Sequence, residues 1–308
     1  MKIKGLVAAT FAAYNPDGSI NLELIPTLVD QLITDGLTGV YVCGTNGEGL
    51  NMTIGERMAI AEAYVKAANK RLLVMVHVGH ASIYESKMLA AHAEQIGADA
   101  ISAVAAFYFK PTTVQNLVDC MTEIASAAPN LPFYYYHIPV ITGVNVDMVE
   151  FLKLSEEKIP NLAGIKYTAS TLHEYQACLG YKNGRYDILS GYDEMLLPAL
   201  SVGAQGAVGS TYTFAAPVYL HIIELFKAGK LEEARSLQAK VIDFIRVITK
   251  YPAIAAQRAI MKMLGTDMSE PRLPLVSLSA QAYEELKTDL EKVDFFELLK
   301  THPPIKKV

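Results

Sequence analysis

The chain has 308 residues, of which 51% are hydrophobic and 19% charged, so it can bury a large core and lacks the composition of a disordered protein. Its net charge of −5, without any Lys/Arg cluster interleaved with aromatic residues, argues against a nucleic-acid partner. No stretch approaches the ~20 apolar residues of a membrane span, and the N-terminus has no signal-peptide core, so we expect a soluble, cytoplasmic protein. The three cysteines are widely separated and fit buried thiols in a reducing compartment better than disulfides.

Short apolar runs alternate with amphipathic segments from Gly5 to about Gly229. The runs are too short and too rich in β-branched and aromatic residues for helices, and their apolar character on both faces is typical of buried parallel strands. The sequence therefore predicts eight strands, at Leu6–Phe11, Gly39–Gly44, Leu72–Gly79, Ala100–Ala106, Phe133–Ile138, Ala163–Thr168, Ile188–Tyr192 and Ala204–Ser210.

The segments between these runs carry helix start and stop signals. Thr53 with Glu56 matches the capping box. Ser82 with Glu85 matches it too, and Asp147 is placed to cap the helix after the fifth strand. Helices are expected to end near glycines that can take the left-handed stop conformation, namely Gly36, Gly97, Gly180 and Gly229.

Strand and helix alternating eight times predict an α/β fold, a parallel eight-stranded (β/α)8 TIM barrel. A doubly wound sheet is the alternative, but it usually carries a nucleotide fingerprint after its first strand, where this chain has FAAY at 11–14. After Gly229 the strands stop, and helical patterns cover 231–250, 252–264 and 279–293. We predict a barrel with the catalytic site over 1–229 and a C-terminal helical extension over 230–308.

A lysine lies in the otherwise apolar sixth strand, at Lys166. Active sites of such barrels lie at the C-terminal strand ends, and Lys166 is two residues from the end of its strand. With a period of two, Lys166 and Thr168 share one face, which we expect to point inward. Desolvation there lowers an amine pKa and leaves a nucleophile, but a lysine that reaches solvent at the rim or pairs with an acid fits the pattern equally well.

The fifth strand contains three consecutive tyrosines, of which Tyr134 and Tyr136 share a face. If that face lines the barrel mouth, the Tyr136 phenol can exchange protons beside Lys166. The alternative is that these tyrosines only pack the core.

Polar residues follow three other strands. The glycine-rich turn GTNGEG at 44–49 can present backbone amides and the Thr45 hydroxyl to a carboxylate, or can be a tight turn that needs glycine for geometry alone. Asp193 and Glu194 follow the seventh strand, and Ser210 the eighth; they suit a hydroxylated substrate, although the two acids can also simply begin the next helix.

Metal and cofactor motifs are missing from the sequence. The seven histidines are dispersed, and the nearest pair, His77 and His80, has opposite strand parity and no third ligand close by in sequence. We find no Walker A loop, dinucleotide fingerprint or nucleophile elbow. We expect no metal and no cofactor, which disfavours a zinc-dependent aldolase.

Taken together, the motifs are identified as those of the dihydrodipicolinate synthase and N-acetylneuraminate lyase family, which the chain resembles over nearly its whole length. They are GTNGEG at 44–49, YYYHIP at 134–139, GIKYT at 164–168, SGYDE at 190–194 and GAVGST at 206–211.

The resemblance implies roles for particular residues. Lys166 is the Schiff-base lysine, Tyr136 the catalytic tyrosine, and Thr45 supports a proton relay. Tyr108 reaches a neighbouring subunit's site in a homotetramer. The residues implied to bind substrate are Thr45, Asn46, Thr168, Gly191, Asp193, Glu194, Gly209 and Ser210. Asn46 replaces a common threonine, which keeps the backbone amide but changes the side chain offered to the carboxylate.

The resemblance also implies a reaction. The synthase branch usually has an arginine in the turn where this chain has Val140 and Ile141, whereas the lyase branch has apolar residues there and a GYDE sequence such as 191–194. We therefore expect reversible cleavage of N-acetylneuraminate to N-acetylmannosamine and pyruvate. The alternatives are dihydrodipicolinate synthase, another pyruvate-dependent sugar-acid aldolase, and a barrel that binds keto acids or sialic acid without turnover.

Overall fold

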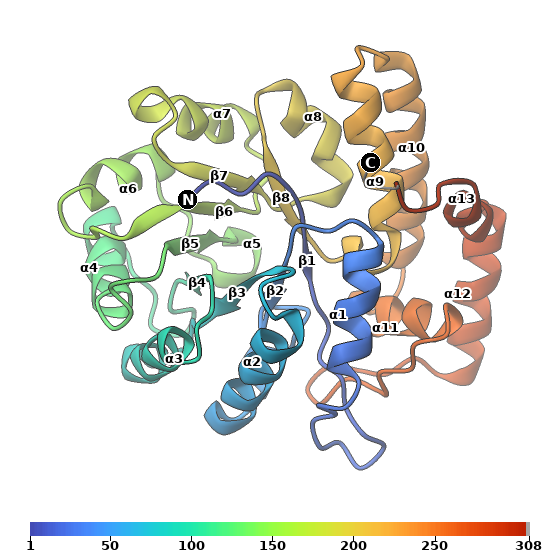
Figure 1. Cartoon of the computed structure of the whole chain (residues 1–308), viewed down its shortest axis with the longest axis horizontal. Coiled ribbons are helices and arrows are strands. Elements are labelled where there is room, and N and C mark those ends of the chain that lie inside the picture. The colour runs from blue at the N-terminus through green and yellow to red at the C-terminus, as the bar shows by residue number, and fades with distance from the viewer. Residues whose placement is uncertain (306–308) are drawn as a thin grey trace.

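The computed structural model describes residues 1–305, which form a closed barrel of eight parallel strands surrounded by helices (Figure 1). Each strand pairs with its neighbours along the chain, and β1 pairs with β8 to close the sheet. The strands are β1 (Gly5–Ala9), β2 (Gly39–Val42), β3 (Leu73–His77), β4 (Ala100–Val104), β5 (Phe133–His137), β6 (Leu162–Tyr167), β7 (Asp187–Ser190) and β8 (Gly206–Gly209). Every strand overlaps a predicted run, so the TIM barrel is confirmed and the open, doubly wound sheet is wrong.

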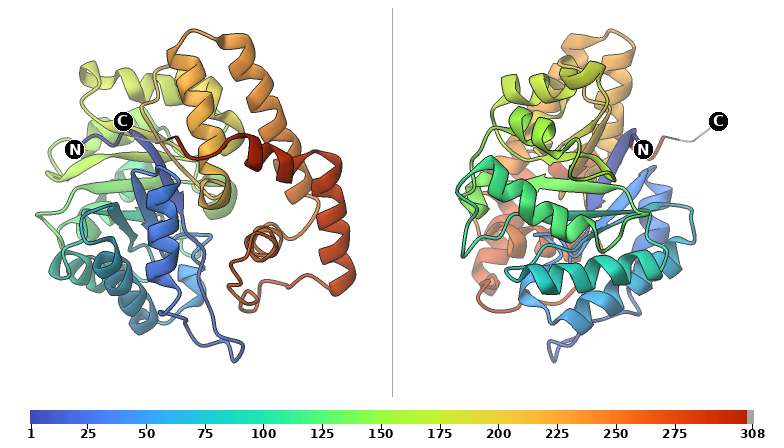
Figure 2. Two further views of the ribbon diagram at one scale, coloured as in Figure 1. Left: turned by 45° about the vertical axis from the view of Figure 1, so that its right-hand side comes forward. Right: turned by 90° about the vertical axis from the view of Figure 1, so that its left-hand side faces the viewer.

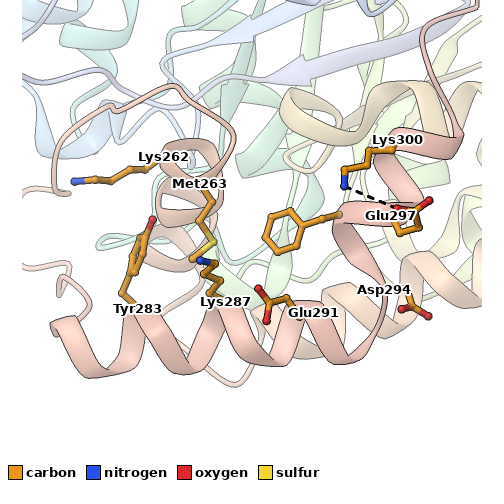
Figure 3. Close-up of a pocket in the computed structure, with 9 residues that line it drawn as sticks. Lys262, Met263, Tyr283, Lys287, Glu291, Asp294, Glu297 and Lys300 are labelled. Atoms are coloured by element: carbon orange, nitrogen blue, oxygen red, sulfur yellow. Dashed lines mark ion pairs between the residues drawn. The ribbon is translucent and has the colours of Figure 1, made fainter.

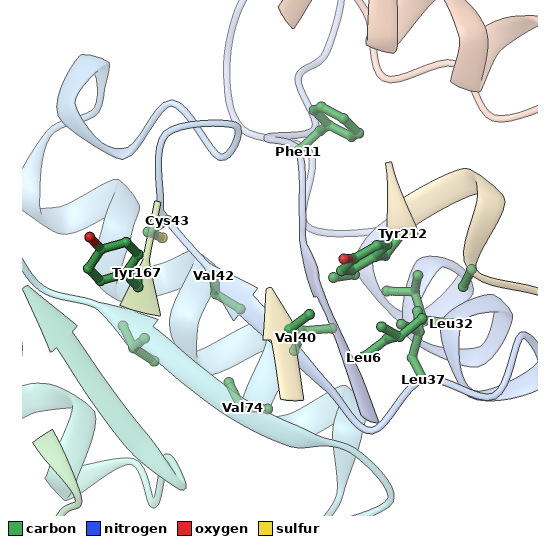
Figure 4. Close-up of a cluster of buried hydrophobic side chains, with 14 of the residues drawn as sticks. Leu6, Phe11, Leu32, Leu37, Val40, Val42, Cys43, Val74, Tyr167 and Tyr212 are labelled. Carbon is green, nitrogen blue, oxygen red and sulfur yellow. The ribbon is translucent and has the colours of Figure 1, made fainter. Parts of the chain in front are cut away.

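Two apolar clusters are separated by the strands. Side chains that alternate inward, among them Val7, Met75 and Tyr134, fill the barrel interior. Side chains that alternate outward, among them Val40 and Tyr167, pack between the sheet and the helices (Figure 4). The barrel is therefore a filled core, and only its rim is available for a site.

Helices connect the strands and cover the outside of the barrel. They are α1 (Ile25–Thr34), α2 (Ile54–Ala68), α3 (Ile83–Gln95), α4 (Val114–Ala125), α5 (Pro139–Thr142), α6 (Met148–Ser155), α7 (Leu172–Gly180), α8 (Leu196–Ser201) and α9 (Tyr212–Lys227). Short 3-10 turns occur at η1 (Gly49–Asn51), η2 (Tyr181–Asn183) and η3 (Asp193–Met195).

The predicted helix signals hold with two exceptions. Thr53 and Glu56 form the full capping box, and Asp147 caps α6. The Ser82 side chain accepts a bond from the Glu85 amide but no reciprocal bond forms, so only half of that box is present. Gly36, Gly97 and Gly229 have positive φ as predicted. Gly180 does not: its φ is −78°, and the left-handed glycine of this connection is Gly184, at φ 74°. Helix α7 does end at Gly180, as predicted, but the 3-10 turn η2 follows it, and left-handed residues first occur at Lys182 and Asn183.

The C-terminal part is helical, as predicted, and comprises α10 (Leu231–Ile248), α11 (Ala253–Met263), α12 (Ala280–Lys292) and α13 (Phe295–Thr301). These helices gather on one side of the barrel, where α10 and α13 contact α9 (Figures 1 and 2). The sequence pattern did not indicate α5 or α13, which have 4 and 7 residues and are too short to show a helical period.

A buried ion pair joins the C-terminal helices to the barrel. Arg258 Nη1 in α11 lies 3.1 Å from Glu48 Oε1, and the two side chains are 3% and 0% exposed. Arg258 also donates a 2.6 Å bond to the Ala12 carbonyl in the loop after β1. The division at residue 229 stays a prediction; the ion pair shows that the two segments share buried contacts.

Candidate active site

Lys166 projects from β6 into the barrel interior, as the strand period predicts. It is only 4% exposed, and its Nζ lies 3.9 Å from the ring centroid of Tyr41 and 4.0 Å from that of Tyr136. It does not reach solvent at the rim, which removes that alternative. Burial lowers the pKa of Lys166 to about 7, against an opposing effect of the Asp193 carboxylate. Much of the amine is therefore neutral near pH 7, as a nucleophile requires.

Tyr136 lies beside this lysine because β5 pairs with β6 in a register that sets Tyr136 opposite Lys166. Its hydroxyl is 3.5 Å from Thr45 Oγ1. Burial raises the pKa of Tyr136 to about 12, and the hydrogen bond with Thr45 opposes this rise. Tyr134 also points inward, whereas Tyr135 points outward and packs on Phe151 with ring centroids 4.8 Å apart. The structure thus brings together an amine, a phenol and a hydroxyl.

The turn after β2 carries Thr45 and Asn46 at the barrel mouth, exposed and half-buried respectively. The turn contains two non-glycine residues with positive φ, Cys43 at 58° and Glu48 at 48°. Contacts from other elements hold this unusual backbone: the Cys43 carbonyl oxygen lies 3.2 Å from His77 Nδ1, and the Glu48 carboxylate is paired with Arg258. The turn is therefore anchored by β3 and by the C-terminal helices.

Asp193 is both the first residue of η3 and a buried part of the site. Its Oδ2 accepts a 2.9 Å bond from the Thr211 amide and a 2.6 Å bond from the Thr211 hydroxyl. Burial raises the pKa of Asp193 to about 6, and the bonds from Thr211 oppose this rise. Glu194 and Ser210 are half-buried next to Asp193 and Gly209 in the chain. The predicted sugar-binding acids thus follow β7 at the same rim as Lys166.

Gly191 and Gly209 are explained by packing within the site. A Cβ at Gly209 would lie 1.7 Å from Asp193 Oδ1, and one at Gly191 would lie 1.9 Å from Thr168 Oγ1. Thr168 itself is buried, and its hydroxyl has no hydrogen-bond partner within residues 1–305. These two glycines leave room for polar side chains at the rim.

We expect Gly209→Ala to destabilise the protein by ~1–3 kcal/mol, because the new methyl group must displace the Asp193 carboxylate from its bonds with Thr211. Gly55→Ala is the matched control, since its Cβ meets nothing within 4 Å and a helical alanine is favoured over glycine. Urea unfolding of the two variants measures the difference. A Gly209→Ala protein as stable as Gly55→Ala contradicts this role for Gly209.

Tyr108 lies outside this cluster. It is 78% exposed in the loop after β4 and packs edge-on against Phe109, with centroids 5.0 Å apart. Beside the cluster is a cavity of about 300 Å³ lined by Thr45, Tyr136 and apolar residues that include Leu50 and Ile141. Tyr108 is not among the residues that line this cavity.

A larger cavity, of about 710 Å³, lies between α11, α12 and α13 (Figure 3). Its charged lining includes Lys262, Lys287 and Glu291, with Met263 and Tyr283 beside them. None of the predicted site residues lines it.

Sequence reasoning missed Tyr41 and the anchoring role of Glu48. Tyr41 is an aromatic residue in an apolar strand, which by itself indicates only core packing. Its strand parity would have placed it inward, but only the closed barrel shows that it faces Lys166.

The chain is similar to known proteins over nearly its whole length. Residues 2–293 match the dihydrodipicolinate synthetase family. The chain belongs to this family. Among curated members, N-acetylneuraminate lyase of Sus scrofa is 39% identical over 298 residues, covering 95% of this chain and 93% of that protein.

Two solved structures of the family are similar along the whole chain. The sialic acid aldolase of Aliivibrio salmonicida is 40% identical with a TM-score of 0.93, covering 96% of this chain and 98% of its own. The catalytic lysine mutant of the Ruminococcus gnavus sialic acid aldolase is 29% identical with a TM-score of 0.91, covering 98% of this chain and 100% of its own.

Among residues 1–305, no group of three or more His, Cys, Asp or Glu side chains is arranged to hold a metal ion. Nor does this part of the chain contain a helix with the length and apolarity of a membrane span.

Proposed function

We propose that this chain is a class I aldolase that forms a Schiff base on Lys166 and reversibly cleaves N-acetylneuraminate to N-acetylmannosamine and pyruvate. The observation that carries the proposal is the Lys166 amine, enclosed in the barrel and 4.0 Å from the ring centroid of Tyr136. The names of its relatives, at 39% and 40% identity, support the same chemistry.

The first step is formation of an imine. The neutral Lys166 amine adds to the ketone carbon of the open-chain sugar acid, and a proton moves from nitrogen to the new alkoxide. Tyr136 then donates its proton to the departing hydroxyl, which leaves as water. The products are a protonated imine and a Tyr136 phenolate, so charge is conserved. The adjacent cation stabilises this phenolate, which burial alone disfavours.

Carbon–carbon cleavage follows. The phenolate takes the proton from the substrate hydroxyl on C4, the C3–C4 bond breaks to release the aldehyde, and its electron pair neutralises the imine as an enamine. Tyr136 returns the proton to C3 and is again a phenolate. Water then adds to the protonated imine, and as pyruvate and the neutral Lys166 amine are released, the surplus proton returns to Tyr136. Thr45, 3.5 Å from the phenol, orients it during these transfers.

Substrate is held at both ends. We assign the keto-acid carboxylate to the turn at Thr45 and Asn46, and the sugar hydroxyls to the rim residues of β6 to β8, which are Thr168, Gly191, Asp193, Glu194, Gly209 and Ser210. Val140 and Ile141 are 77% and 57% exposed at the start of α5 and offer no cation for a second carboxylate. This favours the lyase reaction over the synthase reaction.

We further propose that the enzyme is a cytoplasmic homotetramer in which Tyr108 acts in a neighbouring subunit. Tyr108 and Phe109 are exposed aromatic residues, and exposed apolar side chains also include Leu50 and Ile141. Leu50 and Ile141 line the cavity beside Thr45, which can accept a phenol from a second copy of the chain. Tyr108 would then extend the proton relay from Tyr136 and Thr45.

The proposal is tested by offering the purified protein N-acetylneuraminate, or pyruvate with aspartate semialdehyde, and measuring the products of each. We expect pyruvate and N-acetylmannosamine from the first and no condensation product from the second. Turnover only with aspartate semialdehyde favours dihydrodipicolinate synthase. Saturable pyruvate binding without any turnover favours a binding protein.

Activity should depend on pH through Lys166. Because burial lowers its pKa to about 7, we expect kcat/KM to fall as pH drops through about 7 and the amine is protonated. Asp193→Asn removes a carboxylate that raises the pKa of Lys166, so the fall of kcat/KM at acid pH should occur at lower pH in this variant than in the wild type. Glu194→Gln is the control, and a pH–rate profile of both variants is the measurement. An acid limb that stays in place in Asp193→Asn contradicts the coupling.

A further inference from the structure

Tyr41 is a contact of Lys166 that the reaction sequence above does not use. Its ring centroid is 3.9 Å from Nζ, as close as that of Tyr136. The two rings meet nearly at right angles, with centroids 5.7 Å apart and an interplanar angle of 79°. The nitrogen of Lys166 therefore lies in a corner formed by two aromatic faces.

The corner is held by several elements. The Tyr41 hydroxyl on β2 donates a 3.1 Å bond to Ser102 Oγ on β4, which fixes the ring. The His77 ring on β3 closes the corner, at 6.0 Å from the Tyr41 centroid and 6.1 Å from the Tyr136 centroid. A Cβ at Gly44 would lie 2.5 Å from Tyr41 Cε1, so the first residue of the turn at 44–49 leaves room for the ring.

The two rings can stabilise a cation at a position that is buried from water and has few carboxylates nearby. Tyr41 is 0% exposed, and Lys166 is 4% exposed. The acid that acts on Lys166, Asp193, already accepts two bonds from Thr211 through Oδ2. Aromatic faces carry negative quadrupole density and attract a desolvated cation within about 6 Å of the ring centroid. They stabilise positive charge at Nζ without supplying a base.

We propose that the ring face of Tyr41 is a catalytic contact that stabilises the protonated imine on Lys166. This inference rests on the Schiff-base chemistry proposed above. The reacting nitrogen gains a positive charge when water leaves, and the Tyr41 ring lies against that nitrogen. Tyr41 thus acts through its π face, and its hydroxyl serves only to hold the ring.

The experiment separates the ring's charge distribution from its shape. Position 41 is replaced by Phe and by 3,5-difluoro- and 3,4,5-trifluoro-phenylalanine, which remove π density while nearly keeping the shape. Imine formation is measured as borohydride-trapped protein against pyruvate concentration, and kcat/KM is measured with N-acetylneuraminate. Relative to Tyr41→Phe, which already lacks the hydroxyl, we expect trifluorination to weaken imine formation and kcat/KM by about 10-fold, stepwise with fluorine number.

The same fluorinated residues at Tyr135 are the control, because Tyr135 is buried but points away from the barrel interior. They should leave trapping unchanged. Equal trapping by the Phe and trifluoro variants at position 41 overturns the role of the ring face while leaving the Schiff base intact. A wild-type protein that traps no pyruvate overturns the proposed function and this inference together.

Discussion

Replacing Lys166 with alanine is expected to lower kcat for N-acetylneuraminate cleavage by at least about 10⁴-fold, because it removes the amine proposed to form the imine that accepts the electrons of the breaking bond. The fold should survive, since the substitution removes a buried amine that forms no part of the apolar clusters. The rate of pyruvate release checks the loss of kcat, and the melting temperature of the variant checks that the fold survives.

The control for this variant is Lys262→Ala. Lys262 lies on α11 and pairs with Asp267 at the surface, with its side chain 54% exposed. It should keep wild-type turnover. Substantial turnover in Lys166→Ala would falsify the Schiff-base mechanism for this chain.

Replacing Tyr136 with phenylalanine should lower kcat by about 10²-fold or more, because the ring remains but the group proposed to transfer protons in each step is lost. KM should change much less than kcat, since the hydroxyl is assigned to the transition states and not to ground-state binding. Steady-state kinetics with N-acetylneuraminate measures this split.

Tyr135→Phe is the matched control for Tyr136→Phe. Tyr135 is the preceding residue of β5, but its side chain points away from the barrel interior, and its hydroxyl has no partner within the described residues. Its loss should change kcat by less than about twofold, as expected for a group remote from the reacting atoms. If the two variants behave alike, Tyr136 has no special role in proton transfer.

Much of the fold was predictable because the strand period is a local consequence of the residue pattern, and eight strands alternating with helices are typical of a closed barrel. Side chains alternate along β6, so Lys166 and Thr168 face one side, where the lysine points inward, and Ile165 and Tyr167 face the other. The pairing of β5 with β6 then sets Lys166 opposite Tyr136. The turn at 44–49 was recognisable from its glycines, and Thr45 does lie beside the phenol.

The contacts that hold the site were not predictable, because they join residues distant in the sequence. Glu48 and Arg258 are 210 residues apart, and no local pattern indicates that they pair. Tyr41 reads as an ordinary core residue until the structure sets it against Lys166. Gly209 could be identified within a motif. The reason that a glycine is needed there is the space taken by the Asp193 carboxylate, and this depends on the packing of β7 against β8.

In the proposed reaction, the buried amine of Lys166 becomes covalently bonded to a keto acid. Reduction with borohydride in the presence of pyruvate, followed by peptide mass mapping, tests it most directly. We expect a single reduced pyruvate adduct, located on Lys166. An unmodified Lys166 peptide after this treatment, or an adduct located on another lysine, contradicts a Schiff base on Lys166.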